Sequence, residues 1–138
     1  MRALVQRVRR ASVAVDGVEV VAIGPGLLVL LGVARADTEA EADKLAEKVR
    51  ALRIFDDAAG RINEALGDRE ALCVSQFTLY AETDRGARPS FAAAAPAELA
   101  EPLYERFCEL LGAGRGRFGA RMAVELVNDG PVTVMLEA

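Results

Sequence analysis

One stretch of the chain limits the possible folds more than any other. Residues Leu27–Val33 are aliphatic at every position except Gly32. Because no polar residue alternates with them, both faces of a strand formed here have to be covered by other parts of the protein. No apolar run in the chain approaches the ~18 residues of a membrane-spanning helix. The sequence therefore predicts a buried central strand in a protein that does not span a membrane.

The residues before this strand predict further strands in an antiparallel arrangement. Met1–Arg10 alternates in polarity and predicts a first strand. Ala11–Val15 and Val18–Ile23 are separated by Asp16-Gly17, a dipeptide that is typical of a two-residue hairpin turn. Gly24-Pro25-Gly26 then turns the chain into the buried strand.

Two segments predict amphipathic helices. Thr38 and Glu41 form a capping box at the start of the first, Thr38–Leu52, whose apolar residues recur at helical spacing. The second begins at Pro96, which suits the first turn of a helix, and ends at Gly112. The side chains expected on its buried face are Leu99, Leu103, Tyr104, Phe107, Leu110 and Leu111.

Shorter elements are expected between and after the helices. Arg53–Phe55 predicts a short strand, Arg61–Arg69 predicts irregular structure, and Ala71–Leu79 predicts a longer strand. Tyr80–Phe91 is polar and predicts a loop. Gly112–Gly119 is rich in glycine and arginine, which indicates either a mobile connector or a contact with phosphate.

Two final strands, Met122–Val127 and Val132–Leu136, are expected on either side of Asn128-Asp129-Gly130-Pro131. The order of elements is then strands, helix, strands, helix, strands. This order predicts an α+β fold in which both helices lie on one side of the sheets. The length of 138 residues predicts a single domain over residues 1–138.

Composition excludes several classes of catalytic site. The chain contains no histidine, so a Ser-His-Asp triad, a Cys-His dyad and a His-ligated metal are ruled out. Cys73 and Cys108 lie in apolar segments at a spacing that fits no metal motif, and predict buried thiols in a reducing cytoplasm. The beginning of the chain lacks the apolar core of a signal peptide. We expect a cytoplasmic protein without a metal or cofactor.

A cluster of hydroxyl and amide groups, Ser75-Gln76-Phe77-Thr78-Leu79, closes the predicted strand at Ala71–Leu79. Polar side chains where a strand opens into a loop are a common form of binding site, but they also satisfy local backbone groups. A serine nucleophile needs a base, and the only lysines, Lys44 and Lys48, lie on the first helix. If the protein is a hydrolase, it is not expected to use a side-chain nucleophile.

Two further segments have both an ordinary and a functional interpretation. Arg85, Arg88 and Phe91 lie in one loop, which is either a solvated surface loop or a contact for the end of a single-stranded nucleic acid. The net charge of −4 argues against non-specific coating of nucleic acid. Gly130-Pro131 is either a strand-to-strand turn or a rigid piece of exposed backbone that approaches a ligand or a second chain.

Several of these motifs together resemble the D-aminoacyl-tRNA deacylase family (D-tyrosyl-tRNA deacylases). They are Ser75-Gln76-Phe77-Thr78-Leu79, Arg88-Pro89-Ser90-Phe91, Asn128-Asp129-Gly130-Pro131-Val132-Thr133 and the opening Gln6-Arg7-Val8. The resemblance covers essentially the whole chain. It implies mixed or antiparallel sheets that form a barrel-like layer, with two helices packed on one side.

The resemblance also implies a function and its residues. Family members hydrolyse the ester between a D-amino acid or glycine and the 3′-terminal adenosine of tRNA, including glycine mischarged on tRNA-Ala. They spare L-aminoacyl-tRNA and so proofread chirality in translation. They are homodimers, and Gly130-Pro131, with a cis peptide bond, reaches into the partner's pocket as the chirality filter. No cofactor, membrane or DNA partner is expected.

The roles of individual residues follow from the same resemblance. Backbone N–H groups around Ser75–Phe77 form an oxyanion hole, and the 2′-OH of the terminal adenosine assists the reaction. Gln76 and Phe77 shape the pocket, Thr78 lies beside the scissile ester, and Arg7 holds the Gly-Pro loop. Two alternatives are a small-molecule esterase of the same fold and an RNA-binding module without activity. Activity on free D-amino-acid esters, or affinity without turnover, distinguishes them.

Overall fold

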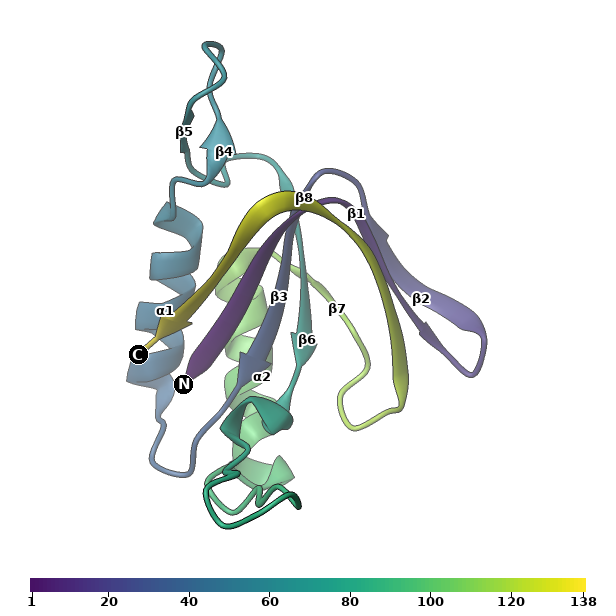
Figure 1. Cartoon of the computed structure of the whole chain (residues 1–138), viewed down its shortest axis with the longest axis vertical. Helices are drawn as coiled ribbons and strands as arrows, with labels where there is room; N and C mark the ends of the chain where they lie inside the picture. Colours follow the sequence, from purple (N-terminus) through teal and green to yellow (C-terminus); the bar gives the residue numbers. More distant parts are fainter.

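The computed structural model describes residues 1–138 and shows one strongly curved sheet with two helices on one face (Figure 1). A small hairpin projects from one end of the sheet. In chain order the elements are β1 (Arg2–Val15), β2 (Val18–Ile23), β3 (Gly26–Gly32), α1 (Glu39–Ala51), β4 (Phe55–Asp56), β5 (Ile62–Glu64), β6 (Glu70–Ser75), the 3₁₀ helix η1 (Phe77–Tyr80), α2 (Ala97–Leu111), β7 (Gly114–Arg115) and β8 (Met122–Glu137).

Strand β1 organises the sheet because it pairs with three other strands. Its first half is antiparallel to β3 and its second half to β2, while β8 runs antiparallel along its other edge. The turn between β1 and β2 has Asp16 and Gly17 at φ of 51° and 77°, the left-handed conformation of the predicted two-residue hairpin. The predicted hairpin is therefore confirmed.

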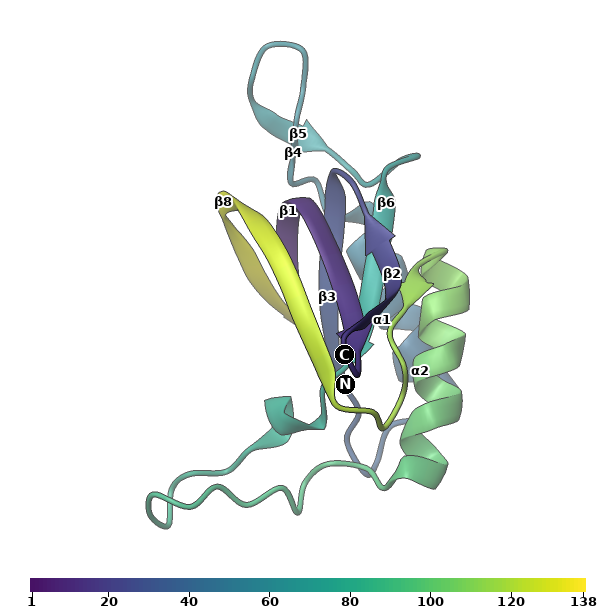
Figure 2. The ribbon, with the colours of Figure 1, turned by 90° about the vertical axis from the view of Figure 1, so that its right-hand side faces the viewer.

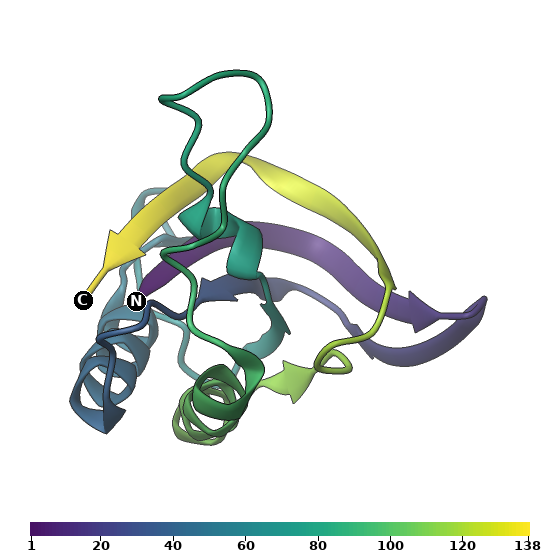
Figure 3. The ribbon, with the colours of Figure 1, turned by 90° about the horizontal axis from the view of Figure 1, so that it is seen from below.

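Strand β3 lies in the interior, as its aliphatic sequence predicts. It is antiparallel to β1 and parallel to β6, and β6 is parallel to β7. Parallel neighbours need a crossover connection, and here α1 and α2 provide the two crossovers. Figures 2 and 3 show both helices on the same face of the sheet. The predicted α+β fold with two helices on one side is confirmed, and the curled mixed sheet is nearly closed into a barrel.

The two faces of β3 contribute to two separate cores. Leu27, Val29 and Leu31 pack with the apolar faces of α1 and α2, where Phe107 is fully buried. Leu28 belongs to the smaller core on the opposite face, inside the curl of the sheet. None of the helices is long and apolar enough to cross a membrane.

The predicted α1 boundaries are correct to one residue. Thr38 is the N-cap, and its side chain and that of Glu41 form the predicted capping box. The hydrogen bonds from Thr38 also hold the pKa of the Glu41 carboxyl below its usual value. Helix α2 ends at Gly112 with φ of 70°, as predicted from the glycine.

The C-terminal residues form one bent strand, and the prediction of two separate strands is wrong. Both halves of β8 are antiparallel to β1, with Val8 opposite Asn128 and Gln6 opposite Thr133. The register shifts on both sides of Val8, so Gly130-Pro131 is a bulge within a continuing strand. The alternative of a strand-to-strand turn at Gly130-Pro131 is excluded, because a turn would reverse the chain direction.

Three smaller predictions also need correction. The strand predicted to reach Leu79 ends at Ser75, and η1 follows because the chain turns over the end of β3 at Gly32. The strand predicted at Arg53–Phe55 pairs only from Phe55, with β5 in a segment predicted to be irregular. Leu110 is 46% exposed, because it lies beside the buried stripe of α2.

Candidate active site

A cavity of about 470 Å³ opens beside the end of β6. Its walls come from β6, the start of η1, the first turns of α2 and the segment from residue 118 to 124. The lining residues are Val33, Val74, Ser75, Gln76, Phe77, Ala95, Ala97, Ala100, Phe118, Gly119, Ala120, Met122 and Val124. Ser75 and Gln76 have the only polar side chains among them, so the cavity is largely apolar.

The polar end of the cavity is positioned by the last residues of the parallel strands. Gln76 continues the ladder beyond β6 by donating its backbone N–H to the carbonyl of Leu31 at 2.7 Å. The chain then winds into η1, which packs over Gly32. A 3₁₀ helix begins with backbone N–H groups that have no partner within the helix. Here those groups belong to Phe77 and Thr78, at the edge of the cavity.

The side chains of the predicted cluster do not all face the cavity. Ser75, Gln76 and Phe77 line it, whereas Thr78 lies beside it and accepts a hydrogen bond from Nε2 of Gln76 at 2.5 Å. Phe77 is 54% exposed and meets Phe91 edge-on, with ring centroids 5.2 Å apart. The contact links the loop between η1 and α2 to the mouth of the cavity.

Neither Cys73 nor Tyr80, which adjoin the cavity in the sequence, is prepared to act as a nucleophile at neutral pH. Burial raises the pKa of the Cys73 thiol well above its ordinary value. Burial, with the charge of Asp37 as a smaller cause, raises the pKa of Tyr80 to about 12. Both groups therefore stay protonated, and Ser75 has no base among the lining residues.

Helix η1 is also held from its outer side. Arg2 donates a hydrogen bond to the carbonyl of Leu79 at 2.9 Å and lies over the ring of Tyr80, 4.5 Å from its centroid. Met1, next to Arg2, is held in place as well, because its buried ammonium group pairs with Asp37 at 2.9 Å. These contacts fix the start of β1 against the end of β3.

The Gly130-Pro131 peptide bond is cis, as the family resemblance implies, and it is fixed by Arg7 and Asn128. Arg7 is 7% exposed and donates through Nε to the carbonyl of Asp129 at 3.2 Å. Nδ2 of Asn128 donates to the carbonyls of Arg7 at 2.9 Å and Val132 at 3.1 Å. The resemblance implies a contact between Arg7 and the Gly-Pro loop, and the structure has one. Arg7 binds the carbonyl of Asp129, the residue before Gly130.

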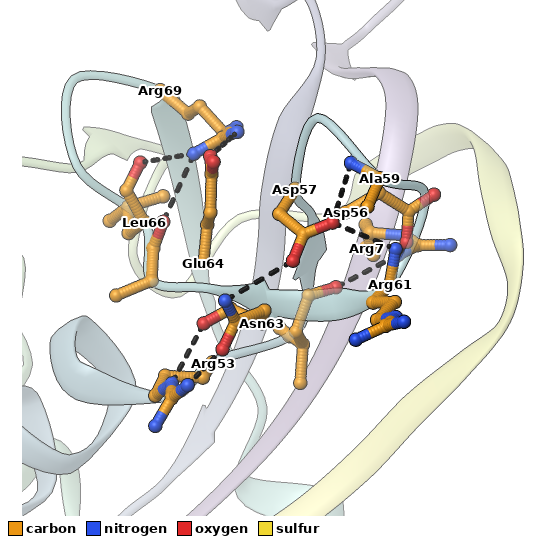
Figure 4. Close-up of polar contacts among 12 residues, drawn as sticks. Arg7, Arg53, Asp56, Asp57, Ala59, Arg61, Asn63, Glu64, Leu66 and Arg69 are labelled. Carbon is orange, nitrogen blue, oxygen red and sulfur yellow. Dashed lines mark hydrogen bonds and ion pairs between the residues drawn. The ribbon is translucent and has the colours of Figure 1, made fainter.

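Arg7 also connects the motif to the projecting β4–β5 hairpin (Figure 4). Its Nη1 donates to the carbonyl of Ile54 at 2.9 Å and pairs with Asp56 at 3.3 Å. Within the hairpin, the Asp57 carboxylate accepts from the backbone N–H groups of Arg61 and Ala59. These bonds hold the pKa of Asp57 below its usual value.

The cavity and the Gly-Pro motif lie at opposite ends of the sheet. Ser75 lies opposite Leu31 of β3, and Leu31 lies opposite Ala3 of β1. Gly130-Pro131 is level with Arg7, four residues further along β1. Of the β8 residues that line the cavity, Val124 comes nearest to the motif in the sequence, six residues before Gly130. Roughly 20 Å of strand therefore separates the motif from the cavity wall of its own chain.

Some lining residues were not anticipated from the sequence. Phe118, Gly119 and Ala120 lie in or beside the segment that was interpreted as a mobile connector or a phosphate contact. The segment is anchored, because Gly116 donates to the carbonyl of Cys73 at 3.1 Å and Phe118 packs against Tyr104. The one available signal was Phe118, an aromatic residue in an otherwise glycine- and arginine-rich stretch.

Comparison with solved structures identifies the class of fold. A c-Myc DNA unwinding element binding protein superposes with a TM-score of 0.94 at 43% identity, covering 100% of this chain and 99% of that chain. A probable eukaryotic D-amino acid tRNA deacylase superposes with a TM-score of 0.86 over 99% of this chain and 98% of that one. At 18% identity the second likeness shows the fold alone.

Sequence comparison identifies the family. The family model described as D-Tyr-tRNA(Tyr) deacylase matches residues 4–137. A D-aminoacyl-tRNA deacylase of Roseiflexus castenholzii is 59% identical, covering 100% of this chain and 92% of the relative. One of Myxococcus xanthus is 54% identical, covering 100% and 95%. The chain belongs to the D-aminoacyl-tRNA deacylase family.

Proposed function

We propose that the protein hydrolyses the ester bond of D-aminoacyl-tRNA, and of glycyl-tRNA mischarged on tRNA-Ala, and spares L-aminoacyl-tRNA. It would act in the cytoplasm as a chiral proofreading enzyme of translation. The observation that carries the proposal is that a chain of this family has both an apolar cavity at Ser75–Phe77 and a rigidly held Gly130-Pro131 backbone. The cavity provides a place for the amino acid, and the backbone provides a wall that carries no side chain.

The cavity suits the aminoacyl end of the substrate. Its apolar walls accommodate a D-amino acid side chain, and Gln76 and Phe77 shape the entrance. The free backbone N–H groups at the start of η1 are suited to polarise the ester carbonyl and to stabilise the oxyanion that forms on attack. Thr78 stands next to this position through its hydrogen bond with Gln76.

The attacking group is water, and the 2′-OH of the terminal adenosine assists. This mechanism accounts for a site without histidine, with protonated Cys73 and with no base beside Ser75. In this mechanism water is the nucleophile, and the substrate's own hydroxyl gives the assistance that a side-chain base would otherwise give.

Gly130-Pro131 excludes L-amino acids by filling the space next to the substrate Cα. A backbone wall tolerates hydrogen on that side and rejects a side chain, and glycine escapes rejection because it has none. Since roughly 20 Å of strand separates the motif from the cavity wall of its own chain, we infer that the motif enters the cavity of a second copy. We therefore propose a homodimer with two-fold symmetry and two composite sites.

The edge of β8 that faces away from β1 supports the dimer proposal. This strand is 16 residues long and pairs on one side only. A long unpaired edge normally needs a cover. Met135 on this strand is 47% exposed, which adds apolar surface for a partner.

The test is the hydrolysis of matched D- and L-tyrosyl-tRNA by purified protein. We expect turnover of the D-ester only, with much slower turnover when the substrate ends in 2′-deoxyadenosine. Equal rates on both enantiomers would refute the filter. Activity on free D-tyrosine esters equal to that on tRNA would favour the small-molecule esterase, and binding without turnover would favour the RNA-binding module.

The mechanism is tested separately by Ser75→Ala and Thr78→Ala. Removing an essential nucleophile costs about 10⁶ in kcat, and we expect both variants to lose far less. A covalent acyl group on Ser75 or Thr78, detected by mass spectrometry of the quenched reaction, would contradict the mechanism.

A further inference from the structure

The turn that leads into β8 carries two arginines at the mouth of the cavity. Phe118, Gly119 and Ala120 line the cavity, and Arg117 and Arg121 bracket them in the sequence. Both arginines are exposed, and neither guanidinium donates a hydrogen bond or forms an ion pair within the protein. We refer to Arg117 and Arg121 as the arginine rim.

The backbone that carries the arginine rim is fixed relative to the cavity. Ala120 donates to the carbonyl of Arg117 at 3.1 Å, and Gly119 has φ of 75°, which closes a tight turn. At Gly116 the chain packs against both β6 and the start of β8, because an added Cβ would lie 3.5 Å from Cγ2 of Val74 and 2.8 Å from the sulfur of Met122. The two guanidinium groups are therefore tethered to a rigid segment that forms one wall of the cavity.

The charge balance around the rim favours an anionic partner. Residues 112–124 contain three arginines and no acidic residue, in a chain whose net charge is −4. The acidic residue that follows, Glu125, already pairs with Arg10 at 2.8 Å. Glu98 and Glu101, in the first turns of α2, are exposed and form no ion pair with the rim. Unpaired, exposed guanidinium groups are well suited to phosphate.

We propose that Arg117 and Arg121 bind backbone phosphates of the unpaired 3′ end of tRNA, next to the terminal adenosine. The inference rests on the proposed function, because it places the aminoacylated adenosine in the cavity. An arginine side chain is short compared with the distance from the terminal adenosine to the acceptor duplex. The phosphates in reach are therefore those of the last unpaired nucleotides, and the rim sets affinity without contacting the ester.

The test compares three substrates that carry the same D-tyrosyl ester. They are D-tyrosyl-adenosine without phosphate, the D-tyrosyl ester of a cytidine-cytidine-adenosine trinucleotide, and D-tyrosyl-tRNA. The variants are Arg117→Gln, Arg121→Gln and the double variant. Lys44→Gln is the matched control, because Lys44 is an exposed cation of α1 that forms no ion pair.

We expect the double variant to lose roughly tenfold or more in kcat/KM on the trinucleotide and tRNA esters, mainly through KM, since each lost guanidinium removes a charge-assisted hydrogen bond to phosphate. On D-tyrosyl-adenosine it should match the wild type. The slope of log kcat/KM against log salt should become shallower by about 1.4, as expected for two phosphate contacts on a single strand. Lys44→Gln should match the wild type throughout.

Three outcomes would overturn the assignment. Unchanged kcat/KM on all substrates would show that the rim binds no phosphate. A loss on tRNA alone would move the contact to the acceptor duplex, and a loss on D-tyrosyl-adenosine as well would place the arginines in the cavity. If the wild type hydrolyses none of the three, the proposed function fails. The rim is then tested by measuring affinity for an oligonucleotide that ends in CCA and carries no amino acid. Equal affinity of the wild type and the double variant for this oligonucleotide would refute the proposal.

Discussion

Arg7 ties three separate segments of the chain together through one buried side chain. Its guanidinium reaches the carbonyl of Ile54, the carboxylate of Asp56, and both the carbonyl and the carboxylate of Asp129. A planar fork with five donors can satisfy several acceptors at once, which a lysine ammonium group cannot do in the same geometry. The position of Gly130-Pro131 therefore depends on a residue more than 120 positions earlier in the chain.

At Gly130 we predict that an added methyl group harms activity much more than stability. Its φ lies outside the left-handed region, and a Cβ would meet only Oδ1 of Asn128, at 3.2 Å. The free energy of unfolding of Gly130→Ala should therefore lie within about 1 kcal/mol of the wild-type value, which is the scale of a Gly-to-Ala change at a compatible backbone conformation. In the partner's cavity the same methyl group would approach the substrate, so kcat/KM on D-tyrosyl-tRNA should fall at least about tenfold.

The measurement is kcat/KM on both enantiomers together with the free energy of unfolding. Gly24→Ala is the matched control, since its Cβ would make only an ordinary contact of 3.5 Å with Glu70. Wild-type rates and unchanged stereoselectivity in Gly130→Ala would mean that the motif is not the filter.

At Asp37 we predict a large loss of stability. Its carboxylate accepts from the buried Met1 ammonium group at 2.9 Å and from the backbone N–H of Ala34 at 2.6 Å. Asp37→Asn leaves that ammonium group without its counter-charge, and breaking a buried pair in this way costs about 3–5 kcal/mol. Urea denaturation measures the loss. Asp43→Asn, which breaks a half-exposed pair with Arg106, should be much milder, and an equal effect of the two would contradict the prediction.

Among the elements, η1 depends on its close approach to the end of β3 at Gly32. A Cβ at Gly32 would lie 3.1 Å from Cβ of Leu79 and 3.2 Å from the carbonyl of Gln76. We predict that Gly32→Ala displaces η1 by a few tenths of an ångström and lowers kcat/KM by about tenfold, because misplacement of about 1 Å can cost 10²-fold. Specific activity of the folded fraction is the measurement.

Gly114→Ala provides the comparison for Gly32→Ala. Its Cβ would meet Cγ2 of Val21 at 2.9 Å, an equally tight contact far from η1. It should lower stability and leave specific activity unchanged. If both variants lose activity in proportion to their loss of stability, activity does not depend on the exact position of η1.

Elements with local signals were predictable from the sequence. The capping box at Thr38, the Asp16-Gly17 turn and the Gly112 helix end each depend on neighbouring residues, and each is confirmed. The polar cluster Ser75-Gln76-Phe77-Thr78-Leu79 was also recognisable from the sequence, and its first three residues line the cavity. Its distant wall at Phe118–Ala120 was not, because that wall is positioned by contacts with β6 and α2 that leave no local pattern.

The errors in the prediction share a physical cause. Continuity of β8 through Gly130-Pro131 depends on pairing with β1, and the end of β6 at Ser75 depends on where β3 ends. The β4–β5 pairing depends on the Asp57 carboxylate binding two backbone N–H groups. In each case a contact with a distant residue, or one specific side-chain bond, decides a structure that propensity leaves open.

For the whole molecule, we predict that two impaired variants regain activity when mixed. Gly130→Ala keeps the cavity, and Ala97→Trp, at an exposed lining position, keeps the Gly-Pro motif while filling the cavity. Random exchange of subunits gives half mixed dimers, each with one intact composite site, so about a quarter of wild-type activity should return. Light scattering should show a dimer, and a fully active monomer or the absence of any recovery would contradict the shared site.

The long pairing between β1 and β8 has a consequence for how the chain is made. Strand β1 leaves the ribosome before the other strands of this fold. Its partner along one edge is β8, the last of these strands to be synthesised, and the pairing runs from Arg2 opposite Glu137 to Val15 opposite Met122. Throughout translation the nascent chain therefore presents an open β edge, which other nascent chains can join. Arg7, Arg9 and Arg10 lie on this edge, and such charges discourage edge-to-edge association. We therefore expect the same arginines that later position the Gly-Pro motif or pair with β8 to limit aggregation of the unfinished protein.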